Sequence, residues 1–134
     1  LAASITAAMQ MADVQPEDIG YVNAHGTGTY LNDLSEAAAY ESVFGHRSRA
    51  IPISSSKSYF GHCLGAAGSL EAVVCILSLR NGVVFPTLRL ENPVQRVGIE
   101  WISGGSQRRQ ISRALSVSAG FGGSNASLLF GLCA

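Results

Sequence analysis

The chain has 134 residues, with nine Lys and Arg against nine Asp and Glu and a formal net charge of zero. Charged residues make up 13% of it, about half of the ~25% usual in soluble domains. This length fits one domain. The composition excludes a nucleic-acid-binding protein, which needs a basic patch, and a disordered chain, which is rich in charge and poor in apolar residues. So little charge on so small a chain predicts that part of its surface is covered, either by a partner or by the rest of a longer protein.

Three cysteines at scattered positions indicate a reduced, cytoplasmic protein rather than a secreted disulfide scaffold. We interpret each of them as a small core or surface residue; they are Cys63, Cys75 and Cys133. The chain begins without Met or a basic leader, which favours a segment joined partway along a longer polypeptide.

Periodicity and turn residues divide the first third into helix, turn, strand, loop and helix, at residues 1–12, 13–18, 19–24, 25–29 and 33–44. The spacing of Asp33 and Glu36 resembles a capping box at the start of the second helix. Gly45 is expected to end that helix.

The remainder predicts a strand, a polar loop, a long apolar helix and a connector, at residues 51–54, 55–61, 62–79 and 83–93. A short strand at 99–102 and a hairpin of 114–119 with 126–130 follow, with a glycine-rich turn at 120–123. The apolar helix contains Glu71 and several Gly and Ser residues, so it is interpreted as a buried core helix and not as a membrane span. The alternation of strands and helices predicts a layered α/β fold, and the hairpin makes its sheet mixed.

Polar clusters follow three of the predicted strands. They are His25 with its Thr and Gly neighbours, the segment from Lys57 to His62, and the glycine-rich turn. Ligands gather at the carboxyl ends of strands in open α/β sheets, so we expect these clusters to converge on one site.

His62 is predicted to begin the long helix, where the positive end of the helix dipole favours a neutral imidazole. A neutral ring can donate a hydrogen bond to a developing oxyanion. Glu71, inside the apolar helix, needs a cationic or hydrogen-bonding partner, and Lys57 is a candidate. A zinc site from His25, His62 and Cys63 matches no known ligand spacing, so no metal is expected.

Four segments together resemble the β-ketoacyl synthases, the thiolase-like condensing enzymes of fatty-acid and polyketide assembly. They are VNAHGTGT (22–29), DxxE (33–36), SSSKSYFGHCLGAAGSLE (54–71) and SAGFGGSNASL (118–128), and the connector FPTLRLENP (85–93) is also typical. The resemblance covers the C-terminal half of the family. It implies one αβ half of an αβαβα sandwich with a mixed five-stranded sheet. Residues 1–134 then form one domain without the N-terminal half and its first strand.

The resemblance also implies residue roles in a decarboxylative Claisen condensation. His25 and His62 stabilise the enolate oxygen that forms when a malonyl unit loses carbon dioxide. Lys57 supports the second histidine through a polar network, and Glu71 and Asp33 are supporting carboxylates.

The family's oxyanion hole uses the backbone N–H at the position of Ala119, where many members carry a bulky Phe. We expect Ala119 to leave a more open acyl pocket. The residues expected to bind substrate or its pantetheine arm are Thr27, Thr29, Phe121 and Gly122.

The family's nucleophilic Cys lies in the N-terminal half, so the expected partners are a Cys-bearing half, acyl carrier protein and a second copy in a dimer. No cofactor is expected beyond the phosphopantetheine arm of the carrier. An alternative is a non-catalytic subunit similar to a chain-length factor, although such subunits commonly lose the two histidines. A thiolase that uses coenzyme A is disfavoured, because its C-terminal half carries a Cys base.

Overall fold

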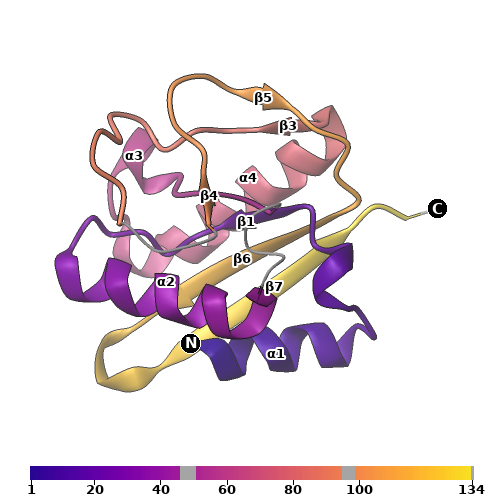
Figure 1. Cartoon of the computed structure of the whole chain (residues 1–134), viewed down its shortest axis with the longest axis horizontal. Coiled ribbons are helices and arrows are strands. Elements are labelled where there is room, and N and C mark those ends of the chain that lie inside the picture. Colours follow the sequence, from indigo (N-terminus) through magenta and orange to yellow (C-terminus); the bar gives the residue numbers. More distant parts are fainter. Residues whose placement is uncertain (46–50, 95–98, 134) are drawn as a thin grey trace.

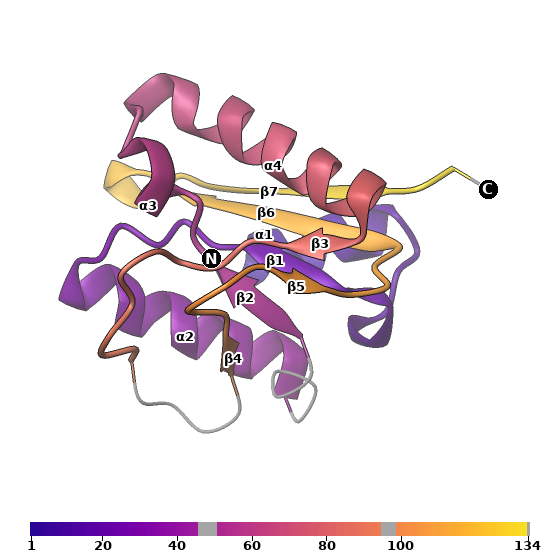
Figure 2. The same ribbon diagram turned by 90° about the horizontal axis from the view of Figure 1, so that it is seen from above.

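The computed structural model describes residues 1–45, 51–94 and 99–133 and has three layers. A central sheet is covered by α1 and α2 on one face and by α4 on the other (Figures 1 and 2). The predicted layered α/β fold is therefore confirmed.

The five-stranded sheet has the order β4-β2-β1-β6-β7. The pairs β1–β2, β1–β6 and β2–β4 are parallel, whereas β7 is antiparallel to β6, so the sheet is mixed as predicted. Its strands are β1 (Tyr21–Asn23), β2 (Pro52–Ser54), β4 (Glu100–Trp101), β6 (Arg113–Ala119) and β7 (Asn125–Gly131). Because β1, β2 and β6 are parallel, their carboxyl ends lie at one edge.

Two helices begin at other residues than expected: α2 begins three residues earlier, and α4 begins five residues later. The helices are α1 (Ala2–Met11), α2 (Tyr30–Phe44), α3 (Lys57–Phe60) and α4 (Ala67–Asn81). The segment predicted as a polar loop thus contains α3. The capping-box interpretation is wrong, because α2 begins at Tyr30 and Glu36 lies in its second turn. The carboxylate of Glu36 instead accepts backbone N–H groups from the loop after β1.

The long apolar helix does not begin at His62. Leu64 has a left-handed φ of 49°, which no regular helix accommodates, and a short 3-10 turn at Leu64–Ala66 precedes α4. The helix ends as expected at Gly82, whose φ of 59° and ψ of 42° form a left-handed cap.

A second, two-stranded sheet pairs β3 (Val83–Val84) with β5 (Gln107–Arg108). The sequence prediction missed it and assigned 83–93 to a connector only. Two-residue strands carry too little periodicity to be recognised, and this pair depends on segments more than 20 residues apart.

Two hydrophobic clusters fill the spaces between the layers. One lies between the sheet and α1 with α2 and includes Ile5, Val22 and Tyr40. The other lies under α4 and includes Tyr21 and Cys75. Residues of β1 therefore alternate between the two faces, as the pleat requires.

The prediction of a buried core helix holds for the inner face of α4, where Cys75 and Leu79 are buried, but the outer face is largely uncovered. Leu70, Val73, Ile76 and Leu77 on this face are between 38% and 51% exposed. The segment Leu64–Asn81 has the length and hydropathy to cross a membrane, and only 28% of it is buried. A helix that is apolar on both faces is expected to have cover on both.

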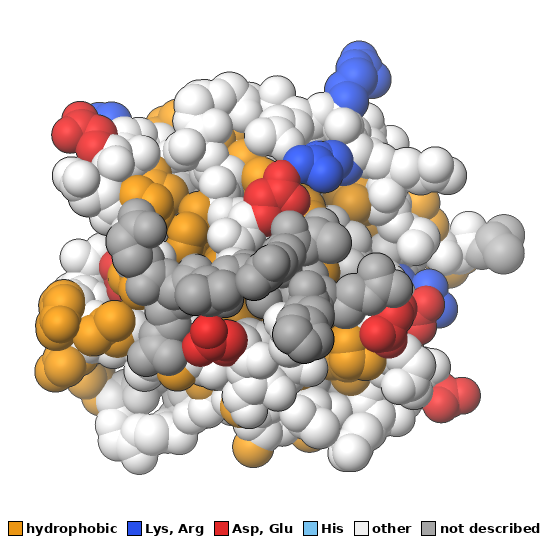
Figure 3. All heavy atoms as spheres, in the orientation of Figure 1, with side chains coloured by type: hydrophobic (Ala, Val, Ile, Leu, Met, Phe, Trp, Pro, Cys, Tyr) orange, Lys and Arg blue, Asp and Glu red, His pale blue; other side chains and the backbone are white. Residues whose placement is uncertain are grey.

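On the opposite side of the molecule, acidic and basic side chains are scattered between hydrophobic ones (Figure 3). Hydrophobic side chains gather there over the first turn of α2, where Tyr30 and Leu31 are 76% and 78% exposed. The low charge of the chain thus accompanies apolar surface on two sides of the molecule.

Candidate active site

The site lies where β1, β2 and β6 end. His25 follows β1, α3 with Lys57 follows β2, and the turn after β6 lies at the same edge (Figures 1 and 2). The structure thus brings the three polar clusters to one edge of the sheet, as the strand-end argument expects.

Lys57 is buried and uses all three N–H groups of an ammonium. Its Nζ donates to the carbonyl oxygen of His25 at 2.6 Å and lies 3.3 Å from Nδ1 of the same residue. The third partner is Oε1 of Glu71, with which it forms an ion pair. Lys57 therefore joins the loop after β1 to helix α4, and the histidine that it contacts is His25 rather than His62, which it was expected to support.

Glu71 is fully buried in the first turns of α4. One carboxylate oxygen pairs with Lys57, and Oε2 accepts a hydrogen bond from Ser118 Oγ of β6 at 3.3 Å. The carboxylate therefore has the cationic partner that its burial requires.

The contact with Lys57 determines which nitrogen of His25 carries the proton. An ammonium can only donate, so Nδ1 accepts and the neutral ring bears its hydrogen on Nε2. Burial lowers the pKa of His25 to about 4, and the charges of Lys57 and His62 act in the same direction. His25 is therefore a neutral hydrogen-bond donor at pH 7.

His62 reaches the same tautomer through a different contact. Its Nδ1 accepts the backbone N–H of Leu64 at 3.2 Å, so the neutral ring also carries its hydrogen on Nε2. The ring centroids of His25 and His62 are 5.5 Å apart and the planes are at 86°. Because α4 begins five residues later, this backbone contact, rather than the expected helix N-terminus, orients His62.

Glu36 was predicted only as half of a capping box, and its contacts with the His25 loop were missed. Its buried carboxylate accepts the N–H groups of His25 and Gly26 at 2.8 and 2.6 Å. Asn32 Nδ2 and the Tyr40 hydroxyl donate to it at 2.8 and 2.7 Å. Burial raises the pKa of Glu36, and these four hydrogen bonds oppose the rise. Glu36 thus fixes the backbone that carries His25.

Asn23 and Ser118 are two further polar residues for which no role was predicted. Period-two alternation along β1 could have indicated Asn23, since it shares a face with His25. Ser118 had no comparable signal, because its contact with Glu71 joins segments 47 residues apart.

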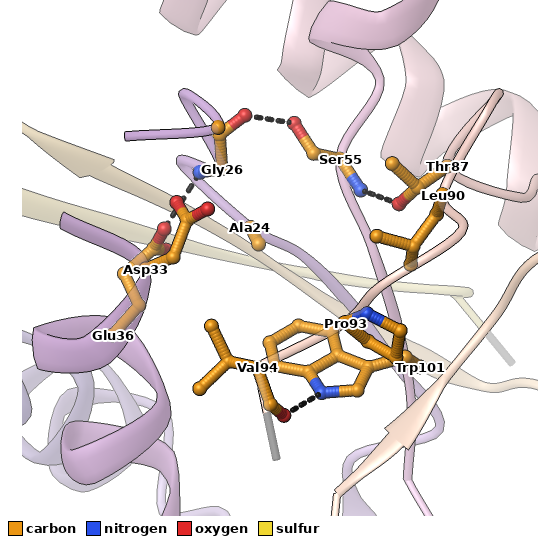
Figure 4. A pocket seen from close by; sticks show the side chains of 11 residues that line it. Ala24, Gly26, Asp33, Glu36, Ser55, Thr87, Leu90, Pro93, Val94 and Trp101 are labelled. Carbon is orange, nitrogen blue, oxygen red and sulfur yellow. Dashed lines mark hydrogen bonds between the residues drawn. The ribbon is translucent and has the colours of Figure 1, made fainter. Parts of the chain in front are cut away.

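Asp33 lies beside Asn32, whose Nδ2 donates to it at 3.0 Å and also to Glu36. It lines a cavity of about 100 Å³ behind the His25 loop, together with Glu36 and Trp101. Figure 4 shows Asp33 and Glu36 on one side of this cavity and Trp101 with Pro93 on the other. Asp33 is thus connected to His25 through Asn32 and Glu36 and not by direct contact.

The residues expected to bind the pantetheine arm lie in the two loops at this edge. The hydroxyls of Thr27 and Thr29 are 2.9 Å apart. Phe121 is fully exposed in the turn after β6, and Gly122 has a left-handed φ of 76°. Ala119 is the last residue of β6 and pairs with Asn125 of β7.

In the part of the chain that the structure describes, His25, His62 and Cys63 do not form a metal site. Cys63 Sγ contacts the carbonyl oxygens of Phe60 and Gly61 at 3.6 and 3.9 Å. Within residues 1–45, 51–94 and 99–133, no three His, Cys, Asp or Glu side chains form a group that could hold a metal ion.

Comparisons with known proteins identify the family of this chain. Residues 1–91 match the family model "Beta-ketoacyl synthase, C-terminal domain". The chain is 41% identical over 123 residues to the tetracenomycin polyketide synthase ketoacyl synthase alpha subunit of Streptomyces glaucescens. It is 39% identical over 127 residues to 3-oxoacyl-[acyl-carrier-protein] synthase 2 of Staphylococcus aureus. These matches cover 92% and 95% of the chain but 29% and 31% of the relatives.

Solved structures show the same fold. One is a type II polyketide ketosynthase in complex with its acyl-carrier protein, which matches with a TM-score of 0.94 and 32% identity over 99% of this chain and 33% of that one. Another is a ketosynthase from Xenorhabdus doucetiae in complex with its chain length factor, with a TM-score of 0.85 and 36% identity over 98% and 33%. The expected thiolase-like fold is confirmed. The chain belongs to the β-ketoacyl synthase family, in which it matches the C-terminal domain, and it spans about a third of the length of these relatives.

Proposed function

We propose that the chain supplies the His/His/Lys part of the active site of a β-ketoacyl synthase. The observation that supports this most strongly is the shared tautomer of His25 and His62, which gives two Nε2–H donors at the carboxyl edge of the sheet. Two neutral donors suit an oxygen that gains negative charge during reaction.

The reaction begins with decarboxylation of a malonyl thioester on acyl carrier protein. The electron pair of the breaking C–C bond moves into the thioester, and carbon dioxide leaves. The enolate oxygen accepts hydrogen bonds from His25 and His62. Lys57 holds Nδ1 of His25 as an acceptor, so the Nε2 proton stays available for donation. Neither ring needs to gain or lose a proton in this step.

Condensation follows when the carbanion attacks an acyl group held as a thioester on a cysteine of the N-terminal half. The new C–C bond forms as the cysteine thiolate leaves. The backbone N–H of Ala119 stabilises the tetrahedral oxyanion together with the N–H of that cysteine. A backbone donor does not depend on the side chain, so Ala119 can fill this role.

The remaining partners follow from the same proposal. Thr27, Thr29, Phe121 and Gly122 line the path of the pantetheine arm, and Asp33 supports the site through Asn32 and Glu36. The exposed outer face of α4 packs against the Cys-bearing half. The assembled enzyme is a cytoplasmic dimer that needs no cofactor.

A mixing experiment tests the proposal. The chain is combined with a Cys-bearing ketosynthase half, and malonyl-carrier decarboxylation and acyl loading are measured. We expect activity only in the assembled protein, and substitution of His62 by Ala should abolish decarboxylation. Full condensing activity from this chain alone would refute the divided site.

The second candidate is a non-catalytic subunit, which the similarity to a ketosynthase in complex with its chain length factor brings into consideration. The presence of both histidines and the buried contact of Lys57 with Nδ1 of His25 favour catalysis. If the assembled complex keeps its activity after both His25 and His62 are replaced by Ala, the subunit is structural.

A further inference from the structure

Asn23 is a fully buried polar residue that the proposed mechanism does not use. It is the last residue of β1, the strand between β2 and β6, and it lies two residues before His25. A buried amide with two donors and an accepting oxygen needs several partners. The identity of those partners indicates its role.

Every side-chain hydrogen bond of Asn23 ends beside the Lys57–Glu71 pair. Its Oδ1 accepts from the N–H and the Oγ of Ser56, both at 3.2 Å. Its Nδ2 donates to Ser56 Oγ at 3.0 Å and to the backbone carbonyl of Glu71 at 3.3 Å. Ser56 directly precedes Lys57, so one amide ties both members of the ion pair to the central strand.

We infer that Asn23 is a positioning residue that fixes the distance between α3 and α4 and thereby keeps Lys57 on Nδ1 of His25. This inference rests on the proposed function only for its kinetic test. An amide suits the position because it donates to α4 and accepts from α3 at once. Asp has the same shape but lacks the donor, and Leu lacks both groups.

The chemical consequence concerns the protonation of His25. The groups that face its ring are Lys57 from α3 and His62 from the following turn, while Glu36 of α2 holds its backbone. If Lys57 moves away, Nδ1 loses its donor and the neighbouring positive charge. His25 then binds a proton at a higher pH, and the cationic ring carries a hydrogen on both nitrogens instead of on Nε2 alone.

The test uses the assembled ketosynthase that contains this chain, and it measures malonyl-carrier decarboxylation from about pH 3.5 to 8, a range that includes the His25 pKa of about 4. Asn23→Asp is expected to lower the rate at pH 7 by about 10- to 100-fold. It should also move the acid limb of the profile upward by about one pH unit. Ser56→Ala introduces no charge and should shift the limb in the same direction by less. The double variant should be no worse than Asn23→Asp, because both changes break one relay.

Asn81→Asp is the matched control. Asn81 also donates its Nδ2 to a carbonyl of α4, that of Leu77 at 2.8 Å, but at the exposed end of the helix. This variant should have the wild-type profile. A lower rate of Asn23→Asp with the acid limb unmoved means a merely structural role and overturns the inference.

If Asn23→Asp does not fold, Ser56→Ala replaces it in the test. A folded Ser56→Ala protein whose acid limb in the pH profile is unmoved overturns the inference as well. A second measurement separates the two proposals. The titration of His25 is followed by NMR of labelled histidine in wild type and Ser56→Ala. If the wild type does not decarboxylate the malonyl carrier, the proposed function fails. In that case the positioning role stands if the His25 titration midpoint rises in the variant, and it falls if the midpoint is unchanged.

Discussion

Leu64 donates its backbone N–H to Nδ1 of His62 at 3.2 Å from a left-handed conformation with φ of 49°. A non-glycine residue in this region carries a cost of about 1–2 kcal/mol. The strain lies at Leu64, two residues after His62, and this residue supplies the N–H that fixes the tautomer of the ring. Strain of this kind is common at functional sites and persists only when the surrounding structure imposes it.

Substitutions at Leu64 should separate the N–H from the strain. Leu64→Gly keeps the N–H and relieves the left-handed conformation, so decarboxylation should stay near the wild-type rate. Leu64→Pro removes the N–H and restricts φ to about −65°, so the rate should fall about 100-fold. Steady-state decarboxylation by the assembled enzyme compares the two. Equal rates for both variants would show that this contact does not orient His62.

Removing one member of the Lys57–Glu71 pair should lower the free energy of unfolding more than replacing both members by apolar residues. Lys57→Met leaves the Glu71 carboxylate buried without its cation and should destabilise the protein by about 3–5 kcal/mol. Combining Lys57→Met with Glu71→Leu should recover most of this loss but no activity, since Nδ1 of His25 still lacks its donor. Urea unfolding and a decarboxylation assay measure the two effects. Recovery of activity in the double variant would contradict the role of Lys57.

The depressed pKa of His25 predicts acid sensitivity. The folded protein holds this pKa at about 4, whereas an unfolded histidine titrates near 6.5. Between these values the unfolded state binds more protons, so stability falls as the pH decreases through this window. The free energy of unfolding should fall by up to about 1.4 kcal/mol per pH unit from this residue. Unfolding of His25→Gln should depend less on pH between 6 and 5, with His62→Gln as the comparison.

Glu36 should matter to both stability and catalysis. Glu36→Gln places an amide NH₂ against groups that are themselves donors, so at least one of the His25, Gly26, Asn32 and Tyr40 contacts is lost. We expect a destabilisation of about 1–3 kcal/mol and a lower decarboxylation rate. Thermal unfolding and kinetics check this, and Glu91→Gln on the exposed connector is the control. A Glu36→Gln protein with wild-type kinetics would exclude a role in holding His25.

Ala119 should influence substrate choice more than reaction rate. Ala119→Phe adds a bulky side chain at the end of β6 while the backbone N–H is retained. We expect a narrower range of acyl chains with little change for the shortest acyl donor. Competition between acyl donors of different length measures the selectivity. An unchanged preference for acyl chain length in Ala119→Phe would contradict the hypothesis of an open pocket.

Much of the fold could be predicted from sequence because its signals are local. The apolar runs of β1, β2 and the β6–β7 hairpin carry β-type composition, and Gly82 marks the end of α4. The start of α4 was misplaced because Leu64 has a helix-forming side chain but a left-handed backbone, and its N–H contact with Nδ1 of His62 has no signal in the residue type. The β3–β5 pair escaped for a similar reason, since pairing between distant short segments has no local signature.

The site was predictable where residue chemistry is unusual for its surroundings. A carboxylate in an apolar helix requires a partner, and Lys57 pairs with Glu71 as that reasoning suggested. Glu36 was misassigned because its spacing from Asp33 fits a local cap, while its carboxylate serves a loop ten residues away. Asn23 looks like one polar residue in an apolar strand, and its contacts 33 and 48 residues distant have no counterpart in the sequence pattern.

The position of β7 at the end of the sheet has a consequence for handling the chain. Its free side presents backbone donors and acceptors along seven residues, Asn125–Gly131, that include no charged side chain. Natural sheets protect such edge strands with charges, prolines or bulges, which prevent strands of other molecules from pairing with them. Isolated chains are therefore expected to associate through β7 into β-rich oligomers. Leu128 is exposed on this strand, and Leu128→Lys should suppress the oligomers. Light scattering measures their size, and thioflavin fluorescence measures their β-sheet content.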